Sequence, residues 1–254
     1  MNRIVALLLV MLFSALPAAA AVRLVSGVSN DTIQITSSFD GERLTFFGTI
    51  APEAGSGVRY VDGPFDVVVV ILGPTQDRVA REKTNNFGIW LNTEQVEFKR
   101  FPSYFHVLSS RRLLDIADIN LLNENFILPE SHAMVPNIAG FMKTLVFGRE
   151  LIRLMSQDGL FGVQENGVQF MSDTFYTAQL TLPSSAPPGP YIAQTYVFQN
   201  GQIIARKSEG FAVRKIAFER FLARSATQSP LLYGIACVIL ALFTGWLGGV
   251  LFRR

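Results

Sequence analysis

The sequence has one cysteine, two histidines and few charged residues over its 254 positions. A single cysteine excludes a disulfide-stapled mini-protein, and so few sulfur and imidazole ligands argue against a zinc site. Charged residues make up 17% of the chain, against about 25% in a typical soluble domain. We therefore expect part of the chain not to face water. Disorder is excluded because 21 phenylalanines provide ample core material.

The positive net charge comes from the two ends of the chain. Arg3, Arg253 and Arg254 lie at these ends. Residues 22–229 hold the other 19 Lys and Arg together with all 20 Asp and Glu, which leaves this stretch with a net charge of −1. A basic face is not expected, and nucleic acid is excluded as a partner.

Residues 1–21 have the features of a secretory signal peptide. Arg3 supplies the positive start, and an apolar run follows over Ile4–Leu16. Small residues then offer a peptidase site, and we predict cleavage after Ala20 or Ala21. An uncleaved N-terminal anchor is the alternative.

The C-terminal stretch Leu231–Phe252 contains 22 residues and no charge. As a helix it would extend over about 33 Å, enough for the hydrocarbon core of a bilayer. We predict a transmembrane helix over 230–252 and a cytoplasmic tail of residues 253–254. A buried helix of a globular protein is the alternative.

This predicted helix carries small residues four positions apart, Ala241, Gly245 and Gly249. Small residues on one face let a second helix approach closely, so helix packing and lipid exposure remain equally open. The only cysteine, Cys237, lies in the same stretch, so an exported body would contain no disulfide. We predict a single-pass protein of a bacterial inner membrane, with its body in the periplasm and its C-terminus in the cytoplasm.

The body has mostly strand patterns interrupted by a helical stretch. We expect a β-rich region over 22–110, a helical insertion over 111–158, further strands over 159–218 and a juxtamembrane stalk over 219–229. Asp66–Leu72 is continuously apolar and β-branched, which predicts a central strand buried on both faces.

Asp-Gly and Asn-Gly pairs predict tight hairpins. These pairs occur at residues 40–41, 166–167 and 200–201. Tyr191 follows a proline-rich corner, where immunoglobulin-like domains often place a tyrosine whose hydroxyl fixes the loop. The predicted fold is a mostly β, immunoglobulin-like sandwich with a helical insertion and one C-terminal transmembrane helix. One sandwich or two separated by helices would both fit.

Residues that carry chemistry are scattered. His106 and His132 are distant in sequence, and the chain has neither a G-x-S-x-G nucleophile motif nor a phosphate-binding loop. Arg78, Arg81 and Lys83 split between two faces of a strand, which favours a solvated edge. The pair at 111–112, two arginines before a helix, has no explanation in the sequence. We predict no enzyme, no metal and no cofactor.

Several stretches resemble one family of uncharacterised alphaproteobacterial proteins described as transmembrane. The resembling stretches are IQITSSFDGERLTFFG, DVVVVILGP, REKTNNFGIWLN, LPSSAPPGPYIAQTYVFQNG and SPLLYGIACVILALFTGWLGGVLFRR. The resemblance implies no activity and no catalytic residue. It does imply a role beside a transporter, because the genes of family members often lie near genes for sulfite-exporter-like permeases.

Two functions follow as hypotheses. The first is an accessory or interaction subunit of a membrane complex, whose partner is the lipid bilayer together with an integral membrane protein such as a sulfite-exporter-like permease, or a second copy of the chain. The second is a periplasmic module that binds a small ligand or an anion for a transporter.

Overall fold

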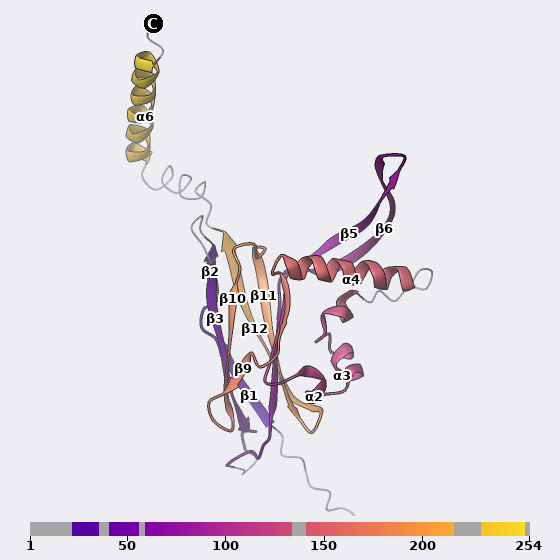
Figure 1. Ribbon diagram of the computed structural model, residues 1–254. Coiled ribbons are helices and arrows are strands. Elements are labelled where there is room, and N and C mark those ends of the chain that lie inside the picture. The colour runs from indigo at the N-terminus through magenta and orange to yellow at the C-terminus, as the bar shows by residue number, and fades with distance from the viewer. Residues whose placement is uncertain (1–21, 36–40, 56–58, 134–140, 216–229, 252–254) are drawn as a thin grey trace, which may run out of the picture.

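The computed structural model describes residues 22–35, 41–55, 59–133, 141–215 and 230–251. The predicted signal peptide, stalk and cytoplasmic tail lie outside these residues. The strands are β1 (Val22–Val28), β2 (Thr32–Ile35), β3 (Glu42–Pro52), β4 (Asp66–Leu72), β5 (Thr75–Asn86), β6 (Ile89–Pro102), β7 (Phe105–Ser109), β8 (Phe161–Gln164), β9 (Val168–Phe170), β10 (Phe175–Leu182), β11 (Gly189–Gln199) and β12 (Gln202–Lys215). The helices are α2 (Leu113–Ile116), α3 (Ile119–Glu124), η1 (Pro129–Ala133), α4 (Phe141–Gln157) and α6 (Pro230–Leu251) (Figure 1).

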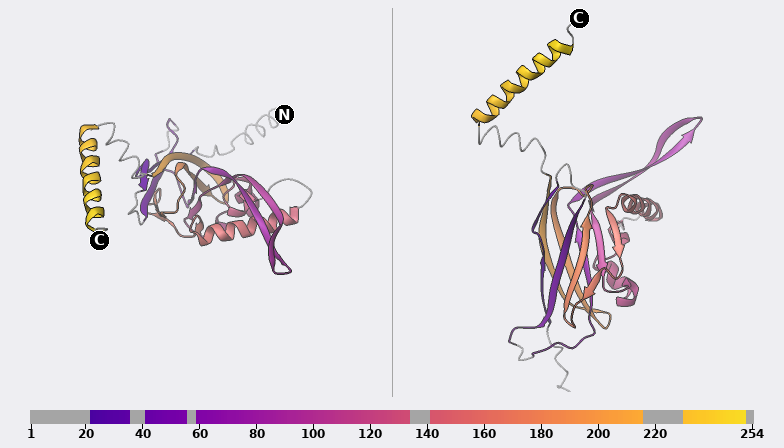
Figure 2. Two further views of the ribbon diagram at one scale, coloured as in Figure 1. Left: turned by 90° about the horizontal axis from the view of Figure 1, so that it is seen from above. Right: turned by 60° about the vertical axis from the view of Figure 1, so that its left-hand side comes forward.

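Two sheets form the body and curl around one core (Figure 2). The first has the order β1-β3-β10-β9 and is antiparallel throughout. The second has the order β2-β12-β11-β4-β7-β8, in which β2 runs parallel to β12 and β8 runs parallel to β7. Strand β4 lies between β11 and β7, and Val67–Ile71 are at most 2% exposed. The predicted central strand over 66–72 is confirmed.

Two of the three predicted hairpins are wrong. Strands β2 and β3 flank the Asp-Gly pair at 40–41 but lie in different sheets, and so do β8 and β9 on either side of residues 166–167. A turn signal specifies a local reversal of the chain, whereas the partner of a strand is decided by distant residues such as those of β12. The hairpin at 200–201 is confirmed, since β11 pairs with β12 and Asn200 has the positive φ of 51° that a tight turn needs.

Strands β5 and β6 form a separate two-stranded sheet that projects from the body as an arm (Figure 1). Strand patterns in the sequence over 77–83, 87–91 and 95–101 predict three short separate strands. The structure instead has one long hairpin that reverses at Phe87 and Gly88, both with positive φ.

Four helices are described within the stretch predicted as a helical insertion, of which residues 134–140 lie outside the described ranges. Asp118 caps α3, because its Oδ1 accepts a hydrogen bond of 2.8 Å from the backbone N–H of Asn120. The inner face of α4 buries Ile152 and Met155 against the body. The bounds of the predicted domains stay a prediction.

The predicted fold class needs a correction. The body is mostly β, but within the described ranges no helix is both long enough and apolar enough to cross a membrane. Helix α6 occupies Pro230–Leu251, the stretch for which the sequence predicted a transmembrane helix. That prediction rested on the length of the stretch and on its lack of charged residues. The immunoglobulin-like sandwich with one C-terminal transmembrane helix is therefore wrong as a description of the fold.

Candidate functional site

The tip of the β5–β6 arm exposes large apolar side chains to solvent. Phe87 is fully exposed, while Ile89 and Trp90 are 64% and 65% exposed. Leu91 is also exposed, as are all the other residues of the range 89–95. Exposed apolar side chains that cluster in this way make the tip a candidate interaction surface.

The turn at the tip presents an aromatic residue in a strained conformation. Phe87 has φ of 53°, which bulky side chains rarely adopt, and Gly88 follows with φ of 86°. The Gly88 N–H donates to Oδ1 of Asn85 at 2.8 Å and so closes the turn. Asn, Asp or Gly normally occupies the place of Phe87 in such a turn. Neither turn formation nor solubility accounts for a phenyl group there.

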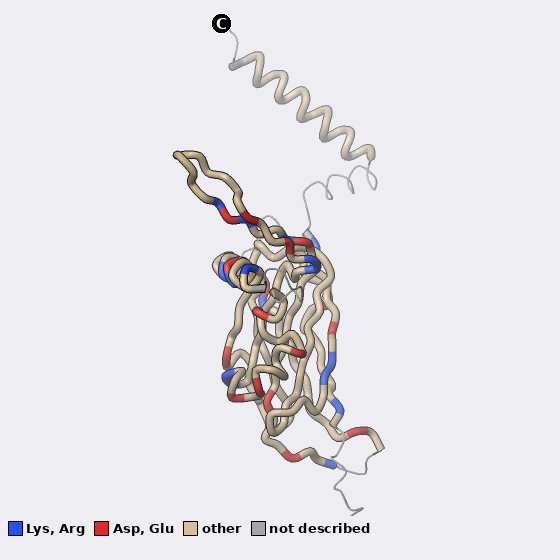
Figure 3. Tube along the Cα trace, turned by 90° about the vertical axis from the view of Figure 1, so that its right-hand side faces the viewer, with Lys and Arg blue, Asp and Glu red and all other residues tan. Residues whose placement is uncertain are grey.

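Charged residues are absent from the ten tip residues Thr84–Thr93 and begin directly below them. Figure 3 shows this uncharged tip above a stem that carries both signs of charge. Lys83 and Glu94 border the tip, and Glu94 forms an ion pair with Lys143 of α4. The basic residues predicted for a solvated edge, Arg78, Arg81 and Lys83, all lie on β5 of this arm.

The root of the arm is anchored in the core. Phe98 and Phe101 of β6 are 1% exposed, and the Phe101 ring stacks on Phe161 with centroids 5.5 Å apart. Arg100 lies between them in the sequence, and its backbone N–H donates a hydrogen bond of 2.9 Å to Oδ1 of Asp77. The packing of Phe98 and Phe101 therefore fixes the root of the arm to the body, and the exposed tip extends from this fixed root.

The arm leaves the body at the end where β12 also finishes (Figure 1). Strand β4 ends at Leu72, opposite Ile192 of β11, and the arm starts three residues later. Gly189 of the same strand β11 pairs with Val213, close to the end of β12. The chain therefore leaves the body toward α6 from the end that carries the arm.

A shallow hollow of about 460 Å³ lies beside the arm root. Its lining includes Arg100, Arg206, His132 and the buried Tyr196, together with Glu124. Arg100 has φ of 51°, which is strained for this residue type. Two guanidinium groups in one hollow are suited to an anion.

The unexplained pair at residues 111–112 now has a partial explanation. The Arg111 guanidinium donates to both carboxylate oxygens of Asp66, and the hydroxyl of Ser110 donates to Asp66 Oδ1 at 3.0 Å. Hydrogen bonding to Asp66 raises the pKa of Arg111. The pair joins the start of β4 to the segment after β7, which is a structural role. Nothing in the structure explains Arg112.

The two histidines lie in separate places. His106 Nε2 is 3.2 Å from the carbonyl oxygen of Gly159, and His132 Nε2 is 3.2 Å from that of Phe126. Burial lowers the pKa of both imidazoles. In the described part of the chain no group of three or more His, Cys, Asp or Glu is placed to hold a metal ion.

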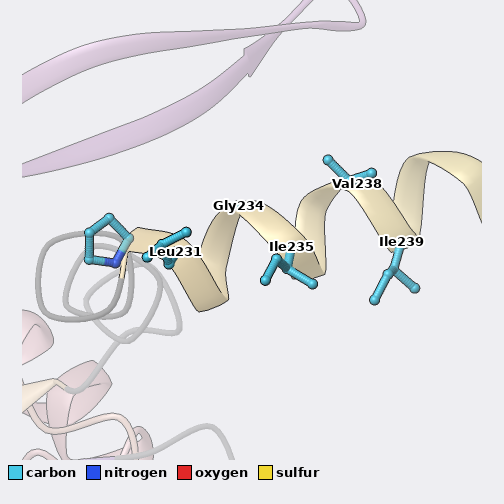
Figure 4. A pocket seen from close by; sticks show the side chains of 6 residues that line it. Leu231, Gly234, Ile235, Val238 and Ile239 are labelled. Carbon is cyan, nitrogen blue, oxygen red and sulfur yellow. The ribbon is translucent and has the colours of Figure 1, made fainter.

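The small residues predicted for helix packing lie on α6. A Cβ atom added to Gly245 or Gly249 would have open space around it within the described residues. Figure 4 shows the start of the same helix, where Leu231, Ile235, Val238 and Ile239 line an open apolar hollow. Only residues of α6 line this hollow, so it is an exposed helix face rather than a cavity.

Tyr191, predicted as a corner residue, lies on β11 and is 1% exposed. Its hydroxyl donates to the carbonyl oxygen of Pro187 at 2.8 Å. Its ring stacks on Phe211 with centroids 5.2 Å apart. The hydroxyl lies where a corner tyrosine would place it.

The arm tip and the arginine-lined hollow were missed at the sequence level. The tip had a signal, since Gly88 interrupts an otherwise strand-like stretch that contains Trp90 and no charge. The hollow had no such signal, because Arg100 and Arg206 are far apart in sequence.

A family model described as a putative transmembrane protein, Alph_Pro_TM, matches residues 23–254. No curated protein matches the chain. The match bears out the alphaproteobacterial family that the sequence resembled, and the family description is consistent with a membrane location.

Proposed function

We propose a function from one premise, that this chain belongs to the family of putative transmembrane proteins whose model matches it. It acts as an accessory or interaction subunit of a membrane complex, with its body in the periplasm and its attachment at the inner membrane. The partner is an integral membrane protein such as a sulfite-exporter-like permease.

The observation that carries this proposal is the arm. A monomeric protein in water gains nothing from a long hairpin that holds Phe87, Ile89 and Trp90 in solvent, whereas a subunit of a membrane complex gains an element that contacts the bilayer or a protein within it. The anchored root supports the same interpretation, because a binding element must be held in a fixed position. Ala241, Gly245 and Gly249 offer a second contact, where small side chains admit a close neighbour.

Affinity purification of the full chain from native membranes in mild detergent tests the proposal. We expect one integral membrane protein to copurify, and the same pair to appear when that protein carries the tag. Gly245→Leu with Gly249→Leu should reduce its recovery, whereas Leu240→Ala, which alters an exposed large residue on the opposite face of α6, serves as the control. Full recovery with the double variant would contradict the α6 contact, and recovery of the chain alone would contradict the proposal.

The arginine-lined hollow supports a second candidate function, the binding of a small ligand or anion for a transporter. A ligand that binds the folded state raises the melting temperature by mass action. We expect a screen of small anions to raise it for the wild type and not for Arg100→Gln with Arg206→Gln. If no anion has an effect, this second candidate is abandoned.

A further inference from the structure

We infer that the tip of the β5–β6 arm, residues 84–93, inserts into the boundary between the headgroups and acyl chains of a lipid bilayer. The inference rests on the membrane location in the proposed function and names what the arm touches there. It does not depend on which protein the chain accompanies.

Apolar side chains lie on both faces of the tip and at its apex, each opposite a polar residue of β5 where the strands pair. Side chains alternate along a strand, so Trp90 faces away from Ile89 and Leu91. Phe87 occupies the apex between the strands. A groove on a protein contacts one face of a hairpin, whereas a bilayer surrounds it. Apolar residues on both faces and at the apex therefore fit lipid better than a protein partner.

Two hydrogen bonds pair polar groups of the tip with one another. Oδ1 of Asn85 accepts the hydrogen bond from the Gly88 N–H, and the hydroxyl of Thr84 donates to that of Thr93 across the hairpin at 3.3 Å. Such pairing reduces the cost of removing these groups from water. The uncharged tip extends over roughly 10 Å from the apex, which matches the ~5–10 Å to which interfacial segments are buried.

The charges below the tip suit the headgroup region. Arg81 and Lys83 lie on β5 just beyond it, and Glu94 is paired with Lys143 of α4. Glu82 is the other acidic residue at this level, so basic side chains outnumber acidic ones by three to two when Lys143 is counted with them. Basic residues beside an inserted apolar segment attract anionic headgroups. The arm also points from the end of the body at which the chain leaves for α6.

The chain's two tryptophans allow a direct test in the full-length protein. Trp246→Phe leaves Trp90 as the only tryptophan, and the protein is reconstituted into phosphatidylglycerol–phosphatidylethanolamine vesicles with brominated acyl chains. We expect the emission of Trp90 to shift to shorter wavelength and to lose intensity to the bromolipids, while aqueous iodide has little effect. Phe87→Ser with Ile89→Ser should reverse both effects.

Tyr60 provides the matched control. It is 82% exposed and precedes β4, at the end of the body opposite the arm. In a chain with Trp90→Phe, Trp246→Phe and Tyr60→Trp, iodide should quench the tryptophan and bromolipids should not.

Two results would overturn the inference. Iodide quenching of Trp90 without bromolipid quenching would leave the tip in water. Protection of Trp90 from both quenchers would mean that a second copy of the chain covers it. Neither result bears on the copurifying partner, and a chain that purifies alone can still insert its tip, so the two proposals fail separately.

Discussion

Arg111 and Asp66, which are 45 positions apart in the sequence, form a bidentate ion pair. Nε of Arg111 lies 2.8 Å from Oδ1 of Asp66, and Nη2 lies 2.6 Å from Oδ2. The Asp66 side chain is 18% exposed and the Arg111 side chain 52%. The Asp66 carboxylate also accepts a hydrogen bond from the Ser110 hydroxyl. Removing Asp66 therefore breaks more hydrogen bonds than removing Arg111 does.

Removing the two partners should therefore have unequal effects. We expect Arg111→Ala to lower the free energy of unfolding by about 1 kcal/mol, as for a half-exposed pair. Asp66→Ala should cost about 2 kcal/mol, because it leaves two donors without their acceptor. Denaturant titration of both variants measures the difference. Arg153→Ala, which breaks an exposed pair within α4, is the control, and equal costs for Asp66 and Arg111 would contradict the prediction.

Two buried tyrosines predict opposite effects of losing a hydroxyl. Tyr191→Phe removes the hydrogen bond to Pro187 and should cost about 1 kcal/mol of unfolding free energy. Tyr104→Phe should cost nothing or stabilise, since the Tyr104 hydroxyl is buried without a hydrogen-bond partner among the described residues. Thermal melts compare them, and a more severe loss in Tyr104→Phe would contradict this account of the core.

Gly48 of β3 is expected to tolerate no side chain. A Cβ atom there would lie 2.5 Å from the Tyr176 hydroxyl and 2.7 Å from the carbonyl oxygen of Val25. Gly48→Ala should therefore destabilise by about 1–3 kcal/mol through overpacking. Gly210→Ala on β12 is the control, because its nearest neighbour would be 4.0 Å away. Similar melting temperatures for the two variants would refute the prediction.

Stability should fall in mild acid because of His106 and His132. Burial lowers the pKa of both imidazoles below 6.5, and the hydrogen bonds with Gly159 and Phe126 only partly oppose this. The unfolded chain therefore binds more protons, so the unfolding free energy declines as the pH falls through about 6.5. Denaturant titrations between about pH 7.5 and about pH 5.5 should show the decline. It should weaken in His106→Asn and in His132→Asn, and an unchanged slope in both would contradict the assignment.

Two local patterns in the sequence predicted local structure correctly. The β-branched run of β4 predicts a buried strand because each of its side chains must leave water, whichever strand lies beside it. Asn200 and Gly201 predict their hairpin because a turn with positive φ depends mainly on its own two residues.

Pairings between distant segments were beyond the same patterns. Strand β2 joins β12 rather than its sequence neighbour β3, a choice decided by the shared core. The ion pair of Arg111 and the hollow of Arg100 and Arg206 likewise depend on segments that only the fold brings together. The arm could have been recognised, since Phe87-Gly88 lies between two strand patterns. The projection of the arm into solvent could not be predicted, because the periodicity of a strand does not reveal whether other strands pair with the hairpin it forms.

The measurement that tests the central claim most directly is native mass spectrometry of the tagged full chain, released from its own membranes in mild detergent. The account predicts one complex of fixed stoichiometry that contains this chain and an integral membrane protein. A spectrum that contains only this chain, as a monomer or as a self-associated species, would contradict the claim that it is an accessory subunit of a membrane complex.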